Sequence, residues 1–119
     1  MQYDLEERTK NFSKDILGFL KNIKENNLNK NIISQLIRSS TSVGANYCEA
    51  NGSSSKKDFR NKIHICKKEV KESKYWIEML ATVEIDKKED LRKLWKEAHE
   101  LTLIFGKISS TLSKFDSRI

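Results

Sequence analysis

The sequence predicts an all-α protein: an antiparallel up-down-up-down four-helix bundle that forms a single domain over residues 1–119. Three observations predict this fold. The chain has no proline and only four glycines, so little in it interrupts long helices. Apolar residues recur at four- and three-residue steps along two long segments, as they do in left-handed bundles. The links between segments are short, which favours antiparallel neighbours.

The first helix is expected from about Tyr3 to Glu25. Its apolar face comprises Leu5, Phe12, Ile16, Phe19, Leu20 and Ile23. The asparagine-rich segment 26–31 should end it, because asparagine competes for backbone hydrogen bonds and tolerates turns. The second helix is expected from about Ile32 to Ala50. Asn51-Gly52 should stop it, since glycine readily takes the left-handed conformation that caps many helices.

Capping signals predict the starts of the last two helices. Ser55 followed by Asp58 resembles a capping box and predicts a third helix that runs to about Val83. Asp86 followed by Glu89 predicts in the same way a fourth helix that runs to about Phe115. The apolar seam of the third helix comprises Phe59, Ile63, Cys66, Val70, Ser73, Ile77 and Leu80. The seam of the fourth comprises Leu91, Leu94, Ala98, Leu101, Phe105, Ile108, Leu112 and Phe115.

Composition and charge limit the class of protein. Charged residues make up 34% of the chain, and no apolar run approaches the ~20 residues of a membrane span. The N-terminal segment is acidic and lacks an apolar signal region, so we expect a cytoplasmic protein without membrane contact. Cys48 and Cys66 lack CxxC or metal-site spacing. We expect buried or half-buried free thiols, with redox or metal roles as the alternative.

A polar seam runs along the second helix, one residue round from its apolar face. It comprises Gln35, Ser39, Ser42, Asn46 and Glu49. If the hairpin turns near Ser53, Arg38 lies level with the third helix and should pair with Glu69 or Glu72. We expect the seam to be largely shielded from water. It could let the two helices approach closely, form a subunit interface, or line a ligand pocket.

A basic stripe accompanies the apolar seam of the third helix. It comprises Arg60, His64, Lys67, Lys71 and Lys74. The surrounding segment 56–74 holds eight basic and three acidic residues, hence +5 of the net +6 charge. Arg60, Lys67, Lys71 and Lys74 should project together from the bundle. Such a stripe is either a solvated helix face or a surface that follows a phosphate backbone.

Catalysis is not indicated by any motif. His64 and His99 lack the Glu-x-x-His pattern of di-iron bundles, since Asn61 and Lys96 stand three residues before them. There is no glycine-rich phosphate loop and no HExxH sequence. We therefore expect a protein that is not an enzyme, with no catalytic residue, no metal site and no cofactor.

The polar seam and the end of the third helix together resemble a known family. The matching residues are Ser39-x-x-Ser42-x-x-x-Asn46-x-x-Glu49, Ser55-x-x-Asp58-Phe59, Lys62, Ile65 and Glu69-x-x-Glu72-Ser73-x-Tyr75-Trp76-Ile77-Glu78-Met79-Leu80. They are similar to the signature of the bacterial four-helix-bundle proteins that include the 23S rRNA-intervening-sequence proteins. The resemblance spans about residues 33–83. Ala50 departs from it, because many relatives have Glu-Gly at this point.

The resemblance implies a four-helix bundle that assembles as a ring, commonly a homopentamer. It also implies kinship with the accessory protein of diversity-generating retroelements, a basic pentamer that binds nucleic acid and a reverse transcriptase. It supplies no catalytic residue. A reverse transcriptase or a ribosomal component is therefore a candidate partner, beside RNA or DNA.

The sequence thus favours a non-enzymatic, oligomeric helical protein that contacts RNA or another nucleic acid through the third helix. The alternative is a protein–protein interaction adaptor whose charge only keeps it soluble. Salt-dependent binding to RNA would separate the two, because phosphate contacts weaken steeply as salt rises.

Overall fold

The described part of the chain forms four α-helices joined by three links. The computed structural model describes residues 4–117, with side chains for residues 4–114. The helices are α1 (Leu5–Leu20), α2 (Lys30–Asn51), α3 (Lys56–Val83) and α4 (Lys88–Ser117), with one 3₁₀ turn, η1 (Ile85–Lys87), before α4. The described residues contain no strand, so the predicted all-α class is confirmed. No helix within them is both long and apolar enough to cross a membrane.

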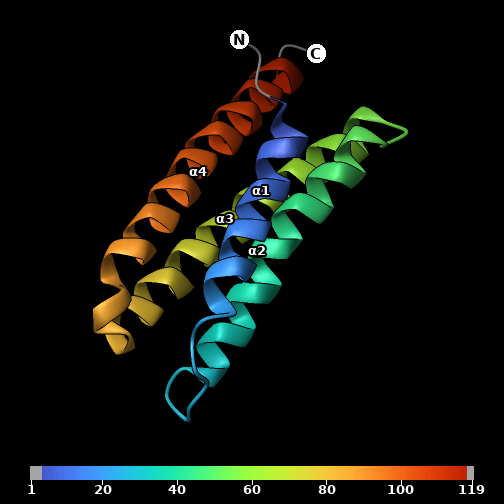
Figure 1. The fold of residues 1–119 in the computed structure, drawn as a ribbon. Helices are drawn as coiled ribbons and strands as arrows, with labels where there is room; N and C mark the ends of the chain where they lie inside the picture. Colours follow the sequence, from blue (N-terminus) through green and yellow to red (C-terminus); the bar gives the residue numbers. More distant parts are fainter. Residues whose placement is uncertain (1–3, 118–119) are drawn as a thin grey trace.

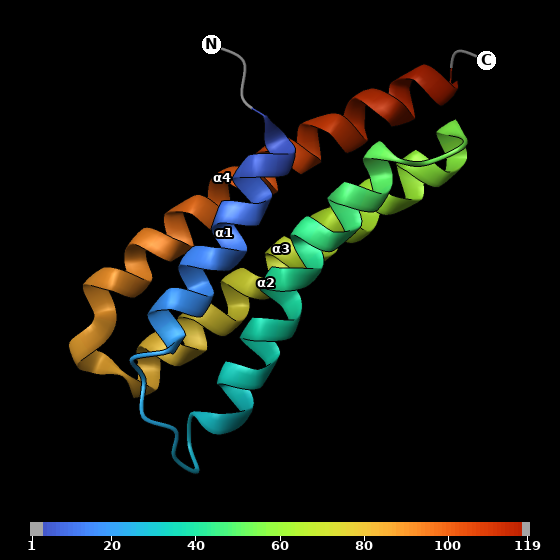
Figure 2. The same ribbon diagram turned by 45° about the vertical axis from the view of Figure 1, so that its right-hand side comes forward.

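The helices lie side by side in an elongated body of 51 × 30 × 21 Å. The α2–α3 turn lies at the same end as the start of α1 and the end of α4, whereas the other two links lie at the opposite end (Figures 1 and 2). α2 packs on α1 and α3, and α4 packs on α3 and α1. Every helix is therefore packed against its neighbours in sequence, and α1 and α4 close the arrangement.

α1 ends at Leu20, five residues before the predicted end. The amides of Asn22 and Ile23 bond to carbonyls only three residues back, so the chain tightens after Leu20 and carries Ile23 into the core. The following link is held by asparagines, as the sequence suggested. Asn26 Oδ1 accepts the amide of Asn29 at 2.9 Å, and Asn29 Oδ1 accepts the amide of Asn26 at 2.8 Å. The predicted start, Tyr3, lies outside the described residues.

The other helix ends fit the predicted signals to different degrees. Ser55 Oγ accepts the amide of Asp58 at 3.0 Å, which confirms the predicted cap of α3. Gly52 follows α2 with φ of −97°, so the left-handed cap expected there was wrong; its amide bonds to the carbonyl of Glu49 instead. α4 begins at Lys88 rather than at Asp86, because residues 85–87 form the 3₁₀ turn η1.

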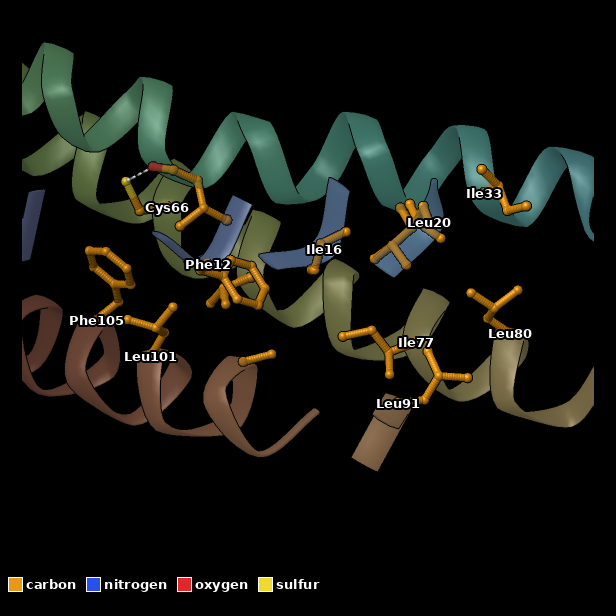
Figure 3. Packing of buried hydrophobic residues seen from close by; sticks show 14 of the residues in the cluster. Phe12, Ile16, Leu20, Ile33, Cys66, Ile77, Leu80, Leu91, Leu101 and Phe105 are labelled. Carbon is orange, nitrogen blue, oxygen red and sulfur yellow. Dashed lines mark hydrogen bonds between the residues drawn. The ribbon is translucent and has the colours of Figure 1, made fainter. Parts of the chain in front are cut away.

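The core lies between the four helices and follows the predicted seams. Ile63, Cys66, Val70, Ser73, Ile77 and Leu80 of α3 are buried, as are Leu91, Ala98, Leu101 and Phe105 of α4. Figure 3 shows Phe12 and Ile16 of α1 directed into the same cluster. Phe59, Leu94, Ile108 and Leu112 are half-buried at its edge. The side chain of Phe115 is outside the described residues.

α1 and α2 cross closely because Gly44 lacks a side chain. A Cβ built on Gly44 would lie 3.4 Å from the carbonyl oxygen of Thr9. One turn along α1, Ser13 Oγ donates to the carbonyl oxygen of Ser40 at 2.8 Å. At this crossing the first two helices therefore meet through backbone atoms and small side chains.

Leu101 and Leu103 provide a matched test of this core. Leu101 is fully buried, whereas Leu103, two residues along the same helix, is 59% exposed. We expect Leu101→Ala to lower the free energy of unfolding by about 2–5 kcal/mol, because a buried leucine leaves a cavity when it is truncated. Leu103→Ala should change it by about 0.5 kcal/mol or less. Urea unfolding followed by circular dichroism measures both; equal losses would contradict this placement of the core.

Candidate nucleic-acid interface

Small side chains fill the buried contact between α2 and α3. Ser39 and Ser73 are fully buried, and their hydroxyl oxygens lie 3.0 Å apart. One to two turns along, the Cys66 thiol donates to the carbonyl oxygen of Val43 at 3.5 Å, as Figure 3 shows. Within the described side chains, no buried nitrogen or oxygen lacks a hydrogen-bond partner. The buried part of the polar seam therefore satisfies itself within the chain.

Arg38 joins α2 to α3 through two carboxylates, as the sequence predicted. Its Nη1 donates to Glu69 Oε1 at 3.2 Å, and its Nη2 donates to Glu72 Oε2. Its Nε donates to Gln35 Oε1 at 3.0 Å, so all three guanidinium nitrogens are engaged. The Arg38 side chain is 46% exposed and that of Glu69 only 13%. The cluster therefore lies at the surface edge of the hairpin, with its carboxylates turned inward.

The rest of the polar seam continues along the same hairpin. Ser42 Oγ donates to Glu69 Oε2 at 3.3 Å, and Asn46 Nδ2 donates to Ser42 Oγ at 3.0 Å. Glu49 pairs with Lys62 at 2.8 Å, and its side chain is 60% exposed. The expected shielding from water thus holds for Ser39, is partial for Ser42 and Asn46, and was wrong for Glu49, which lies near the open end of the hairpin.

The basic stripe of α3 lies along the edge that faces α4. Two of its members contact α4: His64 Nδ1 lies 3.2 Å from Ser109 Oγ, and Lys74 Nζ lies 3.0 Å from His99 Nδ1. Lys67 and Lys71 lie between these two contacts at the same four- and three-residue steps. The stripe therefore borders the α3–α4 groove, on the side of α3 opposite the Arg38 cluster.

The four predicted cations differ in what surrounds them. Lys71 is exposed and Lys67 half-buried, and within the described part of the chain neither has a hydrogen-bond or ion-pair partner. Arg60 is half-buried near the α2–α3 turn and has contacts of its own. Lys74 was expected to project together with the other three, and this was wrong. Its ammonium group lies against α4, where it contacts His99 and the ring of Trp95.

Trp95 is the centre of a small cluster on α4. Its indole is stacked on His99, with ring centroids 5.1 Å apart and planes 8° from parallel. Lys74 Nζ lies 4.9 Å from the indole centroid, at cation–π distance. The indole nitrogen donates to Glu78 Oε2 at 2.9 Å. Lys74 and Glu78 are thereby fixed by the same aromatic side chain.

Ion pairs engage several acidic residues of α3 and α4 on the sides that face α1 and α2. Arg8 of α1 donates to both carboxylate oxygens of Glu97 at 2.8 Å and to Glu100 at 2.9 Å. These contacts raise the pKa of the Arg8 guanidinium, mainly through the hydrogen bonds to Glu97. Glu97 and Glu100 of α4 therefore face α1, just as Glu69 and Glu72 of α3 face α2. Lys67 and Lys71 on the α3–α4 side have no such carboxylate partner among the described residues.

The titratable side chains of the described residues were also compared with the requirements of a metal site. Within residues 4–117, no group of three or more His, Cys, Asp or Glu side chains is placed to hold a metal ion. Of the two free cysteines, Cys66 is buried and Cys48 is exposed. Burial raises the pKa of the Cys66 thiol to about 12. Cys66 was thus correctly expected to be buried, whereas Cys48 is on the surface.

The comparison with protein families covers nearly the whole chain. Residues 1–107 match the family described as 23S rRNA-intervening sequence protein. The chain belongs to this family. The match extends the resemblance, which was based on about residues 33–83, to α1 and most of α4.

A solved structure of the same fold supports the assignment. The crystal structure of a protein of unknown function from the S23 ribosomal protein family of Bacteroides thetaiotaomicron is 29% identical to this chain. It superposes with a TM-score of 0.76, over 87% of this chain and 96% of that one. The chain has no match among curated proteins. The comparisons thus show the family and the fold of this chain.

Sequence reasoning missed several contacts that α1 and α4 make with other parts of the molecule. Arg8 and Trp95 were not singled out, and His99 was considered only as a metal ligand, because their partners on other helices lie far away in the chain. The spacing of Glu97 and Glu100 on one helix face was a usable signal for an opposing cation. Trp95 lies one position outside the α4 seam. From the sequence it could not be distinguished from an aromatic residue that only packs against the edge of the core.

Substitution of Arg38 tests whether its ion pairs with Glu69 and Glu72 stabilise the fold. We expect Arg38→Ala to lower the free energy of unfolding by about 1–2 kcal/mol, because Glu69 is left poorly solvated without its partner. A fully buried pair would cost more, about 3–5 kcal/mol, but half of the Arg38 side chain is in water. Lys87→Ala, in η1, should have little effect. Equal urea midpoints for the two variants would contradict a stabilising role for the cluster.

The two thiols should differ in reactivity. At pH 8 the exposed Cys48 should react with Ellman's reagent, whereas Cys66 should not, because burial keeps its thiol protonated and the thiolate is the nucleophile. The expected stoichiometry is one thiol per folded chain and two in guanidinium. Rapid reaction of both thiols in the folded protein would contradict the packing around Cys66.

Proposed function

We propose that this chain is a non-enzymatic, oligomeric helical protein that contacts RNA or another nucleic acid through the basic stripe of α3. The observation that carries the proposal is the separation of charge. Glu69 and Glu72 are drawn to Arg38 on the α2 side, while Lys67 and Lys71 stand without acidic partners among the described residues. Unneutralised lysines along one line are suited to a phosphate backbone.

The arrangement of the helices supports a rigid platform for such contacts. In this proposal the links at alternate ends make the four helices an antiparallel up-down-up-down bundle, and α3 is one continuous helix of 28 residues. Lys67 and Lys71 are then held in fixed register by the contacts of His64 and Lys74 with α4. Lys74 contributes by positioning, since its own ammonium group already meets His99.

Assembly into a ring, commonly of five subunits, is implied by the family resemblance and forms part of the proposal. An apolar strip of α4 supports it: Ile104, Ile108 and Leu112 are only half-buried and line an open hollow of about 350 Å³. Symmetric rings form when one surface meets a different surface on the next subunit and the rotation closes. A ring would repeat the basic stripe, so that one strand could bind several weak sites at once.

The nucleic-acid contact is tested by reversing the two unpartnered lysines. We expect Lys67→Glu/Lys71→Glu to weaken binding to RNA by about tenfold or more at low salt, because two phosphate contacts become repulsive. The slope of log K against log salt should fall by about 0.7–0.9 per lost contact. The matched control is Lys10→Glu/Lys14→Glu, which changes the net charge equally on the exposed side of α1.

Fluorescence anisotropy with labelled RNA measures both pairs of variants. If both double variants lose affinity equally, binding follows net charge and not the stripe. If the unaltered protein binds neither RNA nor DNA at low salt, the nucleic-acid proposal is refuted and the adaptor alternative replaces it.

Assembly is tested separately by mass. Light scattering coupled to gel filtration should give a mass near five times the 13.9 kDa of the chain at micromolar concentration. The Lys67→Glu/Lys71→Glu variant should give the same mass, since the stripe is not needed for subunit contact. A monomer at all concentrations tested would refute the ring.

A further inference from the structure

An apolar hollow of about 520 Å³ opens between α3 and α4, beside the turn that joins them. Its apolar lining consists of Ile77, Ala81, Leu91 and Trp95. Ala81 continues the basic stripe at the same steps, since Lys74, Glu78 and Ala81 follow one another by four and three residues. The small side chain of Ala81 leaves room where the preceding residues of the stripe are large. The volume is in the range of sites for small ligands or ligand groups.

Trp95 gives the hollow an aromatic side chain on which another flat ring could stack. The indole of Trp95 has His99 stacked on one face. His99 follows Trp95 by one helical turn, whereas Lys88, Leu91 and Arg92 of the hollow precede it by one to two turns. Trp95 itself lines the hollow, and the order of these residues along α4 points to the indole face opposite His99 as the one that borders it. A planar group inside it would extend the existing stack of His99 and Trp95.

The rim of the hollow is cationic. Lys88, Arg92 and Lys96 line it at successive turns of α4 and are exposed. Arg92 forms an ion pair with Glu89, with Nη1 3.3 Å from Oε1, and both side chains are exposed. Glu78 is the one carboxylate among the lining residues, and the Trp95 indole nitrogen holds it. The hollow thus combines an apolar interior with cations at its mouth.

We propose that this hollow receives an unpaired base of a single-stranded nucleic acid, stacked on Trp95, with neighbouring phosphates at Lys88, Arg92 and Lys96. This inference rests on the proposed function and specifies its ligand. Lys74 contacts Trp95, so a strand that follows Lys67 and Lys71 reaches the hollow without leaving the α3–α4 side. Aromatic stacking with a positively charged track is how many proteins hold single strands.

A paired base is excluded from such a site because its faces are covered by neighbouring pairs. Recognition of splayed bases on aromatic side chains is typical of RNA binding to loops and single strands. An acidic amphipathic peptide would also meet cations and apolar side chains here. The stacked indole and the continuity with the unpartnered lysines favour the base.

The experiment uses Trp95 as its own reporter. The chain has two tryptophans, so Trp76→Phe leaves Trp95 alone. In this background, a single-stranded RNA of about 12 nucleotides and its blunt-ended duplex are titrated separately, a length within the range of known single-strand sites. We expect the single strand to quench Trp95 and to bind more tightly, and the duplex to bind without quenching.

Ala81→Leu fills the hollow without changing charge, and Ala81→Ser is the matched control that leaves it open. We expect Ala81→Leu to abolish the quenching and to weaken single-strand binding by about 5- to 150-fold, the range measured for loss of one stacked base. Duplex binding should be unchanged. Trp95→Phe, which keeps a flat ring, should bind the single strand better than Trp95→Ala, and this comparison does not depend on how leucine fits.

The outcomes separate this inference from the proposed function. If RNA binds with unchanged Trp95 fluorescence and Ala81→Leu has no effect, the base site is refuted while the basic stripe stands. Quenching by an acidic amphipathic peptide but not by single-stranded RNA also refutes it, in favour of a protein partner. If neither RNA nor DNA, single-stranded or duplex, binds the unaltered chain, the proposed function fails first and the base site fails with it.

Discussion

The close approach of α2 and α3 is the constraint on which the rest of the structure depends. Ser39 and Ser73 meet in the buried part of this contact, with their hydroxyl oxygens 3.0 Å apart. The longer polar residues of α3, Glu69 and Glu72, are then brought within reach of Arg38 on α2. These contacts fix the register of α2 against α3, because a shift of either helix by one turn would break the serine contact and the ion pairs together.

This contact also determines which side of α3 carries positive charge. Glu69 and Glu72 lie on one side of the apolar seam of α3 and the basic stripe lies on the other, so the two sets face different neighbours. Arg38 pairs with Glu69 and Glu72 on the α2 side, and the basic stripe borders α4. There Trp95 and His99 contact Lys74, and Lys67 and Lys71 remain available. The position of the proposed nucleic-acid surface is therefore a consequence of packing on the opposite side of the helix.

Most of the fold could be predicted from sequence patterns, because the features concerned depend on residues that are close together in the chain. The seams of α3 and α4 and the serine cap at Ser55 depend on residues within a few turns, and the structure confirms them. The early end of α1 was missed because it depends on Ile23 reaching the core, which only the other helices provide. Gly52 was given a conformation that glycine permits but that the α2–α3 turn does not need.

The candidate site was less predictable than the fold. The pairing of Arg38 with Glu69 could be deduced because one short turn sets the level of the two helices. The placement of Lys74 could not, since it depends on Trp95 and His99 from a helix whose rotation about its axis the sequence leaves open. Spacing on one helix shows which side chains share a line, whereas the neighbouring helix decides which of them stay in water.

The contact of α1 with α4 has a consequence for how the chain folds. Each other helix contact joins neighbours in sequence, so most of the structure can form by closing short loops. Docking of α1 is different, since Arg8 and Glu97 are 89 residues apart. α1 is also the shortest of the four α-helices, with 16 residues. The contact of α1 with α4 should therefore form last, after the contacts between sequence neighbours, and amide hydrogens of α1 should exchange through local opening before those of α3.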